Sequence, residues 1–233
     1  MKKSFKRLFV IPAKGQSSRI PSKNSRSFCG QPIIKRVLTE LLKIVETGDK
    51  IHVSTDDTQI IQICNEIPLK LDFLRPESLC KDDVTLRDVR KYILSEYASN
   101  GYSFQTVIQV LPTSVLLAAE VLKKAIKCVE DSANIEAMLS ISRYNTPIQW
   151  AYELGSDYSL SPREEMALQT PSQNLKTYYH ETGDFVIYKN CSIAQKKQIK
   201  KVHGYLLPYP SVDIDNPNDW KLAERLFRGA LNE

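Results

Sequence analysis

The stretch LFVIPAKGQSSRIPSKNSRSFCGQPIIKRVLTELLKIVETG, residues 8–48, decides the fold. It opens with a short β-prone apolar run, residues 8–13, which predicts a buried strand that leaves the sheet at its carboxyl end. A polar loop over residues 14–30 follows, and apolar residues then recur at helical spacing from Ile34 to Val45. The predicted unit is therefore strand, basic loop, helix.

The same alternation continues along the chain. The apolar patterns predict strands at residues 51–54, 72–74, 106–111 and 137–141, and helices from about Asp56 or Asp57, over 85–97 and over 118–129. Strands alternating with helices of this length are typical of βαβ units. We therefore expect an α/β fold whose Rossmann-like, mostly parallel sheet is flanked by helices.

The alternation of strand and helix patterns ends after Pro147, where apolar and polar residues alternate without a strong helical pattern. This predicts a small antiparallel arm or insertion at about residues 145–185, within a single domain of residues 1–233. Beyond it, residues 212–214 are expected to form a strand edge. Asn216 is the predicted N-cap of a last helix, with Pro217 at its first position.

Composition narrows the class of protein. Hydrophobic residues make up 42% and charged residues 25% of the chain, which is typical of a globular protein rather than a disordered or fibrous one. The formal charge of +5 is spread over short basic runs, including Lys196, Lys197, Lys200 and Lys201, so we expect no nucleic-acid partner. No apolar stretch approaches the ~18 residues of a membrane span, so we expect a cytoplasmic protein without a membrane partner.

The five cysteines are Cys29, Cys64, Cys80, Cys128 and Cys191. They form an odd set without a CxxC pair, which predicts reduced thiols rather than a disulfide framework or a metal site. Cys64 and Cys128 lie in helix-like apolar patterns, and the five thiols are expected in the core.

The basic loop after the first strand is the expected ligand site, because ligands of open parallel sheets bind beyond the carboxyl ends of the strands. Gly15 allows close backbone approach to a phosphate, Ser17 offers donors, and Arg19 and Lys23 supply positive charge for a triphosphate. Neither a Walker A loop nor a GxGxxG fingerprint is present. From these residues alone, a solvated basic loop remains an alternative.

Asp213 and Asp215 form the second candidate site. At the end of a strand, carboxylates two residues apart lie on one face and can share a divalent cation. The alternative interpretation is that they cap the helix that follows.

Several segments match, in order, the sequence patterns of one enzyme family. They are IPAKGQSSRIPSKN (11–24), FCGQPII (28–34), VSTDD (53–57), FLRPESL (73–79), PIQWA (147–151), SQNLKTYYHETGDF (172–185) and SVDIDNPNDW (211–220). Together they resemble the acylneuraminate cytidylyltransferase (CMP-sialic acid synthetase) family over nearly the whole chain. The PIQ and SQNLKTYYHETGDF segments look most like its pseudaminic acid cytidylyltransferase branch.

The resemblance implies a fold of the nucleotide-diphospho-sugar transferase type, a cytidylyltransferase activity, and CTP and a nine-carbon nonulosonic acid as substrates. It implies Mg2+ held by Asp213 and Asp215, with Lys23 and Arg19 as catalytic residues. The implied nucleotide-binding residues are Ala13, Lys14, Gly15, Ser17, Asn24 and Arg75, and the implied sugar-binding residues are Gln173, Tyr179 and His180. Members of this family are commonly homodimers, which makes the arm a candidate dimerisation element.

The chain departs from the family pattern at four positions. Lys14, Gln16, Ser18 and Pro171 stand where Arg, Gly, Lys and Arg are usual. A different acceptor, such as 3-deoxy-manno-octulosonate or a hexose phosphate, and a catalytically silent nucleotide-binding homologue therefore stay open. Each enzymatic interpretation requires Lys23 and Asp215 to share one cleft.

Overall fold

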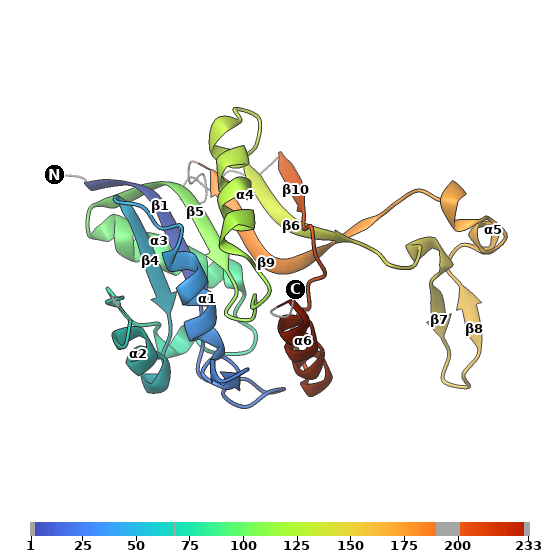
Figure 1. Ribbon diagram of the computed structural model, residues 1–233, viewed down its shortest axis with the longest axis horizontal. Coiled ribbons are helices and arrows are strands. Elements are labelled where there is room, and N and C mark those ends of the chain that lie inside the picture. Colours follow the sequence, from blue (N-terminus) through green and yellow to red (C-terminus); the bar gives the residue numbers. More distant parts are fainter. Residues whose placement is uncertain (1–2, 68, 190–200, 231–233) are drawn as a thin grey trace.

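The computed structural model describes residues 3–67, 69–189 and 201–230. Its main sheet has the strand order β10-β6-β9-β5-β1-β4, and every neighbouring pair is parallel except those that β9 makes. The strands are β1 (Lys3–Pro12), β4 (Asp49–Ser54), β5 (Tyr102–Val110), β6 (Ala137–Arg143), β9 (Tyr179–Lys189) and β10 (Val202–Leu206). This confirms the predicted mostly parallel α/β sheet (Figure 1).

Helices cover both faces of the sheet (Figure 1). They are α1 (Ile33–Leu42), α2 (Thr58–Asn65), α3 (Leu86–Ser99), α4 (Ala119–Asp131) and α6 (Pro217–Ala230). Leu8 and Val10 of β1 pack in a cluster with α3, whereas Phe9 and Ile11 pack in the larger core with the other four helices. Since β1 is buried on both faces, it is apolar without alternation, as its sequence predicted.

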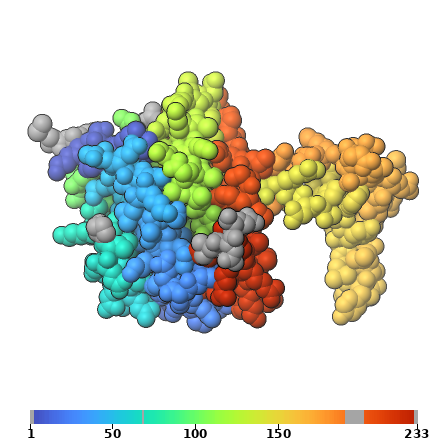
Figure 2. Space-filling view, in the orientation of Figure 1, coloured from blue at the N-terminus to red at the C-terminus, as the bar shows by residue number. Residues whose placement is uncertain are grey.

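The carboxyl ends of the parallel strands meet at one edge of the sheet. The loop after β1 carries the short strands β2 (Ser27–Phe28) and β3 (Gln31–Pro32) and lies beside α6 (Figures 1 and 2). The Phe28 ring meets Trp220 edge-on with centroids 5.5 Å apart, which fixes the loop against α6. Segments from opposite ends of the sequence therefore border the same edge.

Two predicted strands are wrong. Residues 72–74 form no strand, because only Phe73 packs inward while Leu74 is half exposed. Residues 212–214 also lie outside any strand: β10 ends at Leu206, and Pro208 and Pro210 then lack the N–H groups that a ladder needs. The edge strand β10 itself is largely exposed, so its sequence carries no apolar pattern to predict it.

An arm projects from the carboxyl end of β6 and the amino end of β9 (Figures 1 and 2). It carries the hairpin of β7 (Tyr152–Leu154) and β8 (Leu160–Pro162), the short helix α5 (Glu165–Leu168) and two 3-10 turns, Ile148–Trp150 and Ser172–Asn174; a third such turn, Glu77–Leu79, lies in the body. The side chains of Gln149 and Trp150 donate to the carbonyls of Lys176 and Ala167 at 2.8 Å each. These bonds give the arm an internal structure of its own.

Of the cysteines in the described ranges, Cys64 is buried as predicted and Cys29 and Cys80 are partly buried, but Cys128 is exposed on α4, so its predicted place in the core is wrong. The four that are described, Cys29, Cys64, Cys80 and Cys128, are free thiols. Cys191 and the lysines at 196, 197 and 200 lie outside the described residues. Within the described part of the chain, every helix is too short or too polar to cross a bilayer.

Candidate active site

The loop after β1 is tied to the end of β4. The Ala13 N–H donates to the Ser54 carbonyl at 2.9 Å, and the Asn24 side chain donates to the Lys14 carbonyl at 2.8 Å. Ala13 and Asn24 are both buried, so they shape the loop from within. The backbone between them is thereby held in one conformation at the edge of the sheet.

Gly15 lies against the start of α2. Its N–H donates to Asp56 Oδ1 at 2.9 Å, and a Cβ at this position would lie 2.9 Å from Cβ and Oδ2 of Asp57. Asp57 is the N-cap of α2, accepting from the N–H groups of Gln59 and Ile60, so the helix begins where the sequence predicted. The capped helix therefore leaves room at position 15 for glycine alone.

A cavity of about 410 Å3, which we call the loop cavity, opens beside this turn. Its lining includes Gly15, Gln16, Ser17, Ser18, Lys81 and Asp82. The Lys14 ammonium reaches across to Asp82 Oδ1 at 2.6 Å, so the turn and the 80–82 segment face each other. Backbone N–H groups, hydroxyls and lysines around such a space suit a polyphosphate.

The basic loop and the acidic segment near the carboxyl end meet in space. Arg19 Nη1 lies 2.8 Å from Asp215 Oδ2, and Lys23 Nζ lies 3.6 Å from Asp215 Oδ1. The Lys23 ammonium also donates to the Ile214 carbonyl at 2.8 Å. The convergence required by the sequence interpretation is therefore present, although the strand expected at 212–214 is not.

The start of α6 fixes the position of Asp215. Asn216 Oδ1 accepts from the N–H groups of Asn218 and Asp219, which confirms the predicted N-cap. In return, Asp219 Oδ2 accepts from the N–H groups of Asp215 and Asn216 at 3.0 and 2.9 Å. Because Asn216 and Asp219 do the capping, the Asp215 carboxylate points to Arg19 and Lys23 instead.

Asp213 is placed by a separate contact. Ser211, two residues before it, donates to Asp184 Oδ2 on β9 at 2.5 Å. The pKa of Asp213 is raised, first by partial burial and then by the charge of Asp215. Burial likewise raises the pKa of Asp184, with a further contribution from the charge of Asp213. Three carboxylates therefore lie near one another at this end of the sheet.

Two further cavities border the root of the arm. The strand-end cavity, about 420 Å3, is lined by Ser142, Arg143, Asn145, His180 and residues 206–211. The neck cavity, about 290 Å3, lies toward the arm and is lined by Arg143, Asn145, Gln173, Lys176, Tyr178 and their neighbours. Arg143 and Asn145 border both spaces, so the two cavities meet at the end of β6.

A family model described as Cytidylyltransferase matches residues 8–226. The chain belongs to the cytidylyltransferase family. It is 28% identical to a pseudaminic acid cytidylyltransferase of Campylobacter jejuni over 96% of this chain and 97% of the relative. It is 27% identical to a CMP-N,N'-diacetyllegionaminic acid synthase of Legionella pneumophila, over 94% and 95% of the two chains.

Solved structures agree on the fold. A CMP:2-keto-3-deoxy-manno-octonic acid synthetase complexed with CTP superimposes with a TM-score of 0.68 at 16% identity, covering 97% of this chain and 99% of the other. A 4-diphosphocytidyl-2C-methyl-D-erythritol synthase from Anaerococcus prevotii gives a TM-score of 0.65 at 13% identity, covering 96% of each chain. These structures share the fold of the chain, and the family model makes the chain a nucleotidyltransferase.

The predicted nucleotide residues of this cytidylyltransferase fall into two groups. Gly15 and Ser17 line the loop cavity, whereas Ala13 and Asn24 support the loop from behind. Arg75 is also buried: its guanidinium donates to the Ser54 hydroxyl at 3.1 Å and to the Ser54 carbonyl at 2.9 Å. The structure therefore shows Arg75 supporting the end of β4, and its contact with nucleotide stays a prediction.

The residues predicted to bind the sugar do not all lie in one cavity. His180 lines the strand-end cavity and Gln173 the neck cavity, while Tyr179 does not appear in the lining of either and is 48% exposed. Tyr178, its neighbour, lines the neck cavity instead. The sequence interpretation missed Arg143, Asp184 and the 80–82 segment of the cytidylyltransferase, since no local pattern marks them as lying beside the site.

Proposed function

We propose that the chain transfers CMP from CTP to the anomeric hydroxyl of a nine-carbon acidic sugar, pseudaminic acid or a related nonulosonate, and releases pyrophosphate. The names of its relatives from Campylobacter and Legionella support this class of acceptor. The observation that carries the proposal is the meeting of Lys23 and Arg19 with Asp215 at the carboxyl edge of the sheet.

In the proposed reaction, the hydroxyl oxygen of the sugar attacks the α-phosphorus of CTP. The bond from that phosphorus to the bridging oxygen of the β-phosphate breaks, pyrophosphate leaves, and the hydroxyl proton passes to solvent. Lys23 and Arg19 neutralise the phosphate charge, while Gly15 and Ser17 supply donors that position the triphosphate. No side chain of the protein needs to form a covalent intermediate.

The carboxylates of Asp213 and Asp215 fit magnesium. Hard oxygen donors suit this ion, which protein sites typically bind through one or two carboxylates together with substrate phosphates. Among the described side chains, no group of three or more His, Cys, Asp or Glu residues is arranged to hold a metal ion, so two protein ligands would leave the other positions to phosphate and water. When bound, Mg2+ would supply positive charge to the phosphates during transfer.

We further propose that the arm pairs two copies of the chain. Large apolar side chains are exposed along it, among them Leu154 at 66%, Tyr158 at 85%, Leu160 at 59% and Met166 at 82%. Exposed apolar surface of this kind marks an interaction site. A second copy is the proposed occupant, because members of the family that the sequence resembles are commonly homodimers.

The direct test of the reaction is incubation of the purified chain with CTP, Mg2+ and separate nonulosonic acids. The panel includes pseudaminic, legionaminic and N-acetylneuraminic acids, with 3-deoxy-manno-octulosonate and a hexose phosphate as alternative acceptors. Mass spectrometry should detect a CMP-nonulosonate, with pyrophosphate released in equal amount. Turnover of 3-deoxy-manno-octulosonate alone would contradict the nine-carbon assignment, and CTP binding without any turnover would favour a catalytically silent homologue.

A further inference from the structure

Arg143 occupies a distinctive place at the root of the arm. It is the last residue of β6, paired across the ladder with Tyr179 of β9, and it borders both the strand-end and the neck cavity. A side chain at the end of a hydrogen-bonded strand is positioned more rigidly than one on a loop. Arg143 is exposed, and its backbone is held by the sheet at the border of the two cavities.

The charges around these cavities have one sign. Apart from Arg143, the charged side chain that lines them is Lys176, and His180 adds a titratable ring. No Asp or Glu is among the described residues that line either space. An electropositive lining of this kind favours an anionic ligand over a neutral one.

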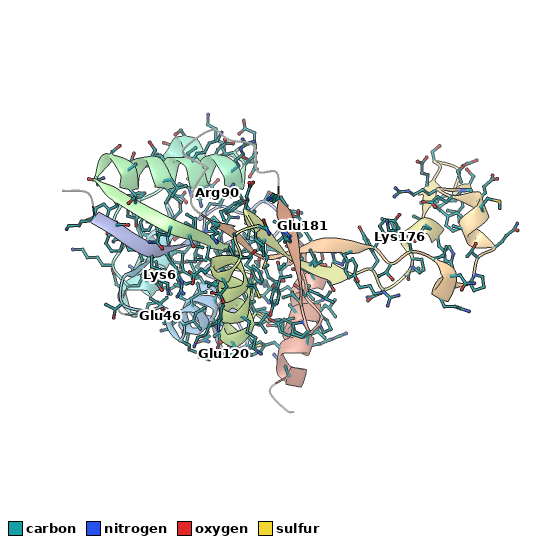
Figure 3. All side chains as sticks on the ribbon, turned by 90° about the horizontal axis from the view of Figure 1, so that it is seen from above. Lys6, Glu46, Arg90, Glu120, Lys176 and Glu181 are labelled. Atoms are coloured by element: carbon teal, nitrogen blue, oxygen red, sulfur yellow. The ribbon has the colours of Figure 1, made fainter. Side chains whose placement is uncertain are left out.

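Within the described ranges, the Arg143 side chain forms no ion pair, hydrogen bond or cation–π contact. Other arginines of the chain are engaged: Arg7 with Glu130, Arg36 with the Phe28 carbonyl and Arg75 with Ser54. Lys176, which Figure 3 labels on the arm, has its ammonium 5.4 Å from the centre of the Tyr178 ring. The Arg143 guanidinium therefore has its N–H donors to offer to a ligand.

A planar guanidinium matches a carboxylate, because its parallel N–H groups can donate to both oxygens at once. The acceptor class of the proposed function carries its carboxylate on the anomeric carbon, beside the hydroxyl that attacks CTP. A residue that binds this carboxylate also orients the attacking hydroxyl. The strand-end cavity is lined from Arg143 to Ser211, two residues before Asp213, so such an anchor borders the same cavity as the segment that leads to the proposed metal ligands.

We propose that Arg143 binds the carboxylate of the acidic acceptor and thereby selects acidic sugars and orients their anomeric hydroxyl. The inference rests on the proposed function and deepens it.

The test compares Arg143→Gln with the wild type on two acceptors, the acidic sugar and its C1 carboxamide. Arg143→Gln should lower kcat/KM for the acid by roughly 10- to 150-fold, the value of a charged hydrogen bond, and leave kcat/KM for the carboxamide within about threefold. Arg143→Lys should recover part of the loss, because an ammonium cannot make the bidentate pair. The dissociation constant for CTP and the melting temperature should stay at the wild-type values.

The matched control is Lys91→Gln, which removes an exposed cation paired with Asp88 on α3 and should leave kcat/KM for the acid within about threefold of the wild type. Lys176→Gln removes the other lining cation and should cost less than Arg143→Gln. Equal losses on the acid and the carboxamide would overturn the role of Arg143, as would a large loss in Lys176→Gln with none in Arg143→Gln. Calorimetry with the acid separates the two proposals. Binding without turnover that disappears in Arg143→Gln would support the anchor and contradict the proposed reaction, and no binding of any acidic sugar to the wild type would overturn both.

Discussion

The ammonium of Lys23 lies 3.6 Å from Oδ1 of Asp215 and donates to the carbonyl of Ile214 at 2.8 Å. One group thus joins the loop after the first strand to the segment before the last helix. The Lys23 side chain is 19% exposed, so it is held near the carboxylate while one side stays open to a ligand.

Lys23→Gln should lower kcat by about 10²- to 10³-fold, because it removes a positioned charge that stabilises the transferring phosphate. Pyrophosphate release at saturating CTP measures the effect. Lys35→Gln is the matched control: Lys35 pairs with the exposed Glu66 on the surface, and its replacement should leave kcat unchanged. A kcat for Lys23→Gln within about threefold of the wild type would contradict the assignment.

Asp213→Asn and Asp215→Asn should each raise the Mg2+ concentration for half-maximal activity at least about tenfold, since an amide is a weaker ligand than a carboxylate. Chelation of divalent ions should abolish turnover of the wild type, and added Mg2+ should restore it. Asp157→Asn, on the arm, is the control and should keep the wild-type Mg2+ dependence. Activity that survives chelation would refute the magnesium site.

Gly15→Ala should weaken CTP binding by on the order of tenfold, because the added Cβ would meet the Asp57 side chain at 2.9 Å and displace the loop from the Asp56 carboxylate. Gly229→Ala is a control on α6, where an added Cβ meets nothing within 4 Å. Its affinity for CTP should match that of the wild type. Calorimetric titration with CTP distinguishes the two variants. Equal affinities for CTP in both would show that the loop tolerates a side chain at position 15.

His52 should make folding stability depend on pH. It is 1% exposed, its ring centroid lies 4.3 Å from that of Phe73, and burial lowers its pKa from 6.5 to about 4. Between these values the unfolded chain binds a proton that the folded chain does not. Stability is therefore full above about pH 6.5 and falls by about 3 kcal/mol as pH drops toward 4.

Urea unfolding at pH 7.5 and pH 5 measures this difference. His52→Gln removes the titrating ring and should flatten the pH dependence, whereas His203→Gln, at an exposed position on β10, should retain it. An unchanged slope in His52→Gln would assign the acid sensitivity to other groups.

The double variant Leu154→Glu/Leu160→Glu should convert a dimer into a monomer. These residues pair across the β7–β8 hairpin and are 66% and 59% exposed, so two new charges would be buried in the proposed interface. Light scattering of the wild type at about 10 μM should give the mass of two chains, and Leu86→Glu, at a 43% exposed position on α3, should keep it. A monomeric wild type would contradict the role of the arm.

The local elements could be predicted because their patterns act over a few residues. The run at 8–13 marked a strand buried on both faces, and Asp57 and Asn216 marked helix starts that the hydrogen bonds confirm. The strand predicted at residues 72–74 was wrong, because the single inward-packing residue Phe73 does not make a strand pattern. The edge strand β10 was not predicted, because it is largely exposed and an exposed strand needs no apolar pattern.

By itself the sequence determined the βαβ character of the chain, the basic loop at residues 14–30, the capped start of α6 and the motifs that match the cytidylyltransferase family. Only the tertiary structure brought Asp215 to Lys23, put Asp184 beside Ser211 and set Arg143 between two cavities. Periodicity and capping encode neighbours within a few positions along the chain. Contacts between distant segments depend on strand order and register, which packing of the whole sheet decides.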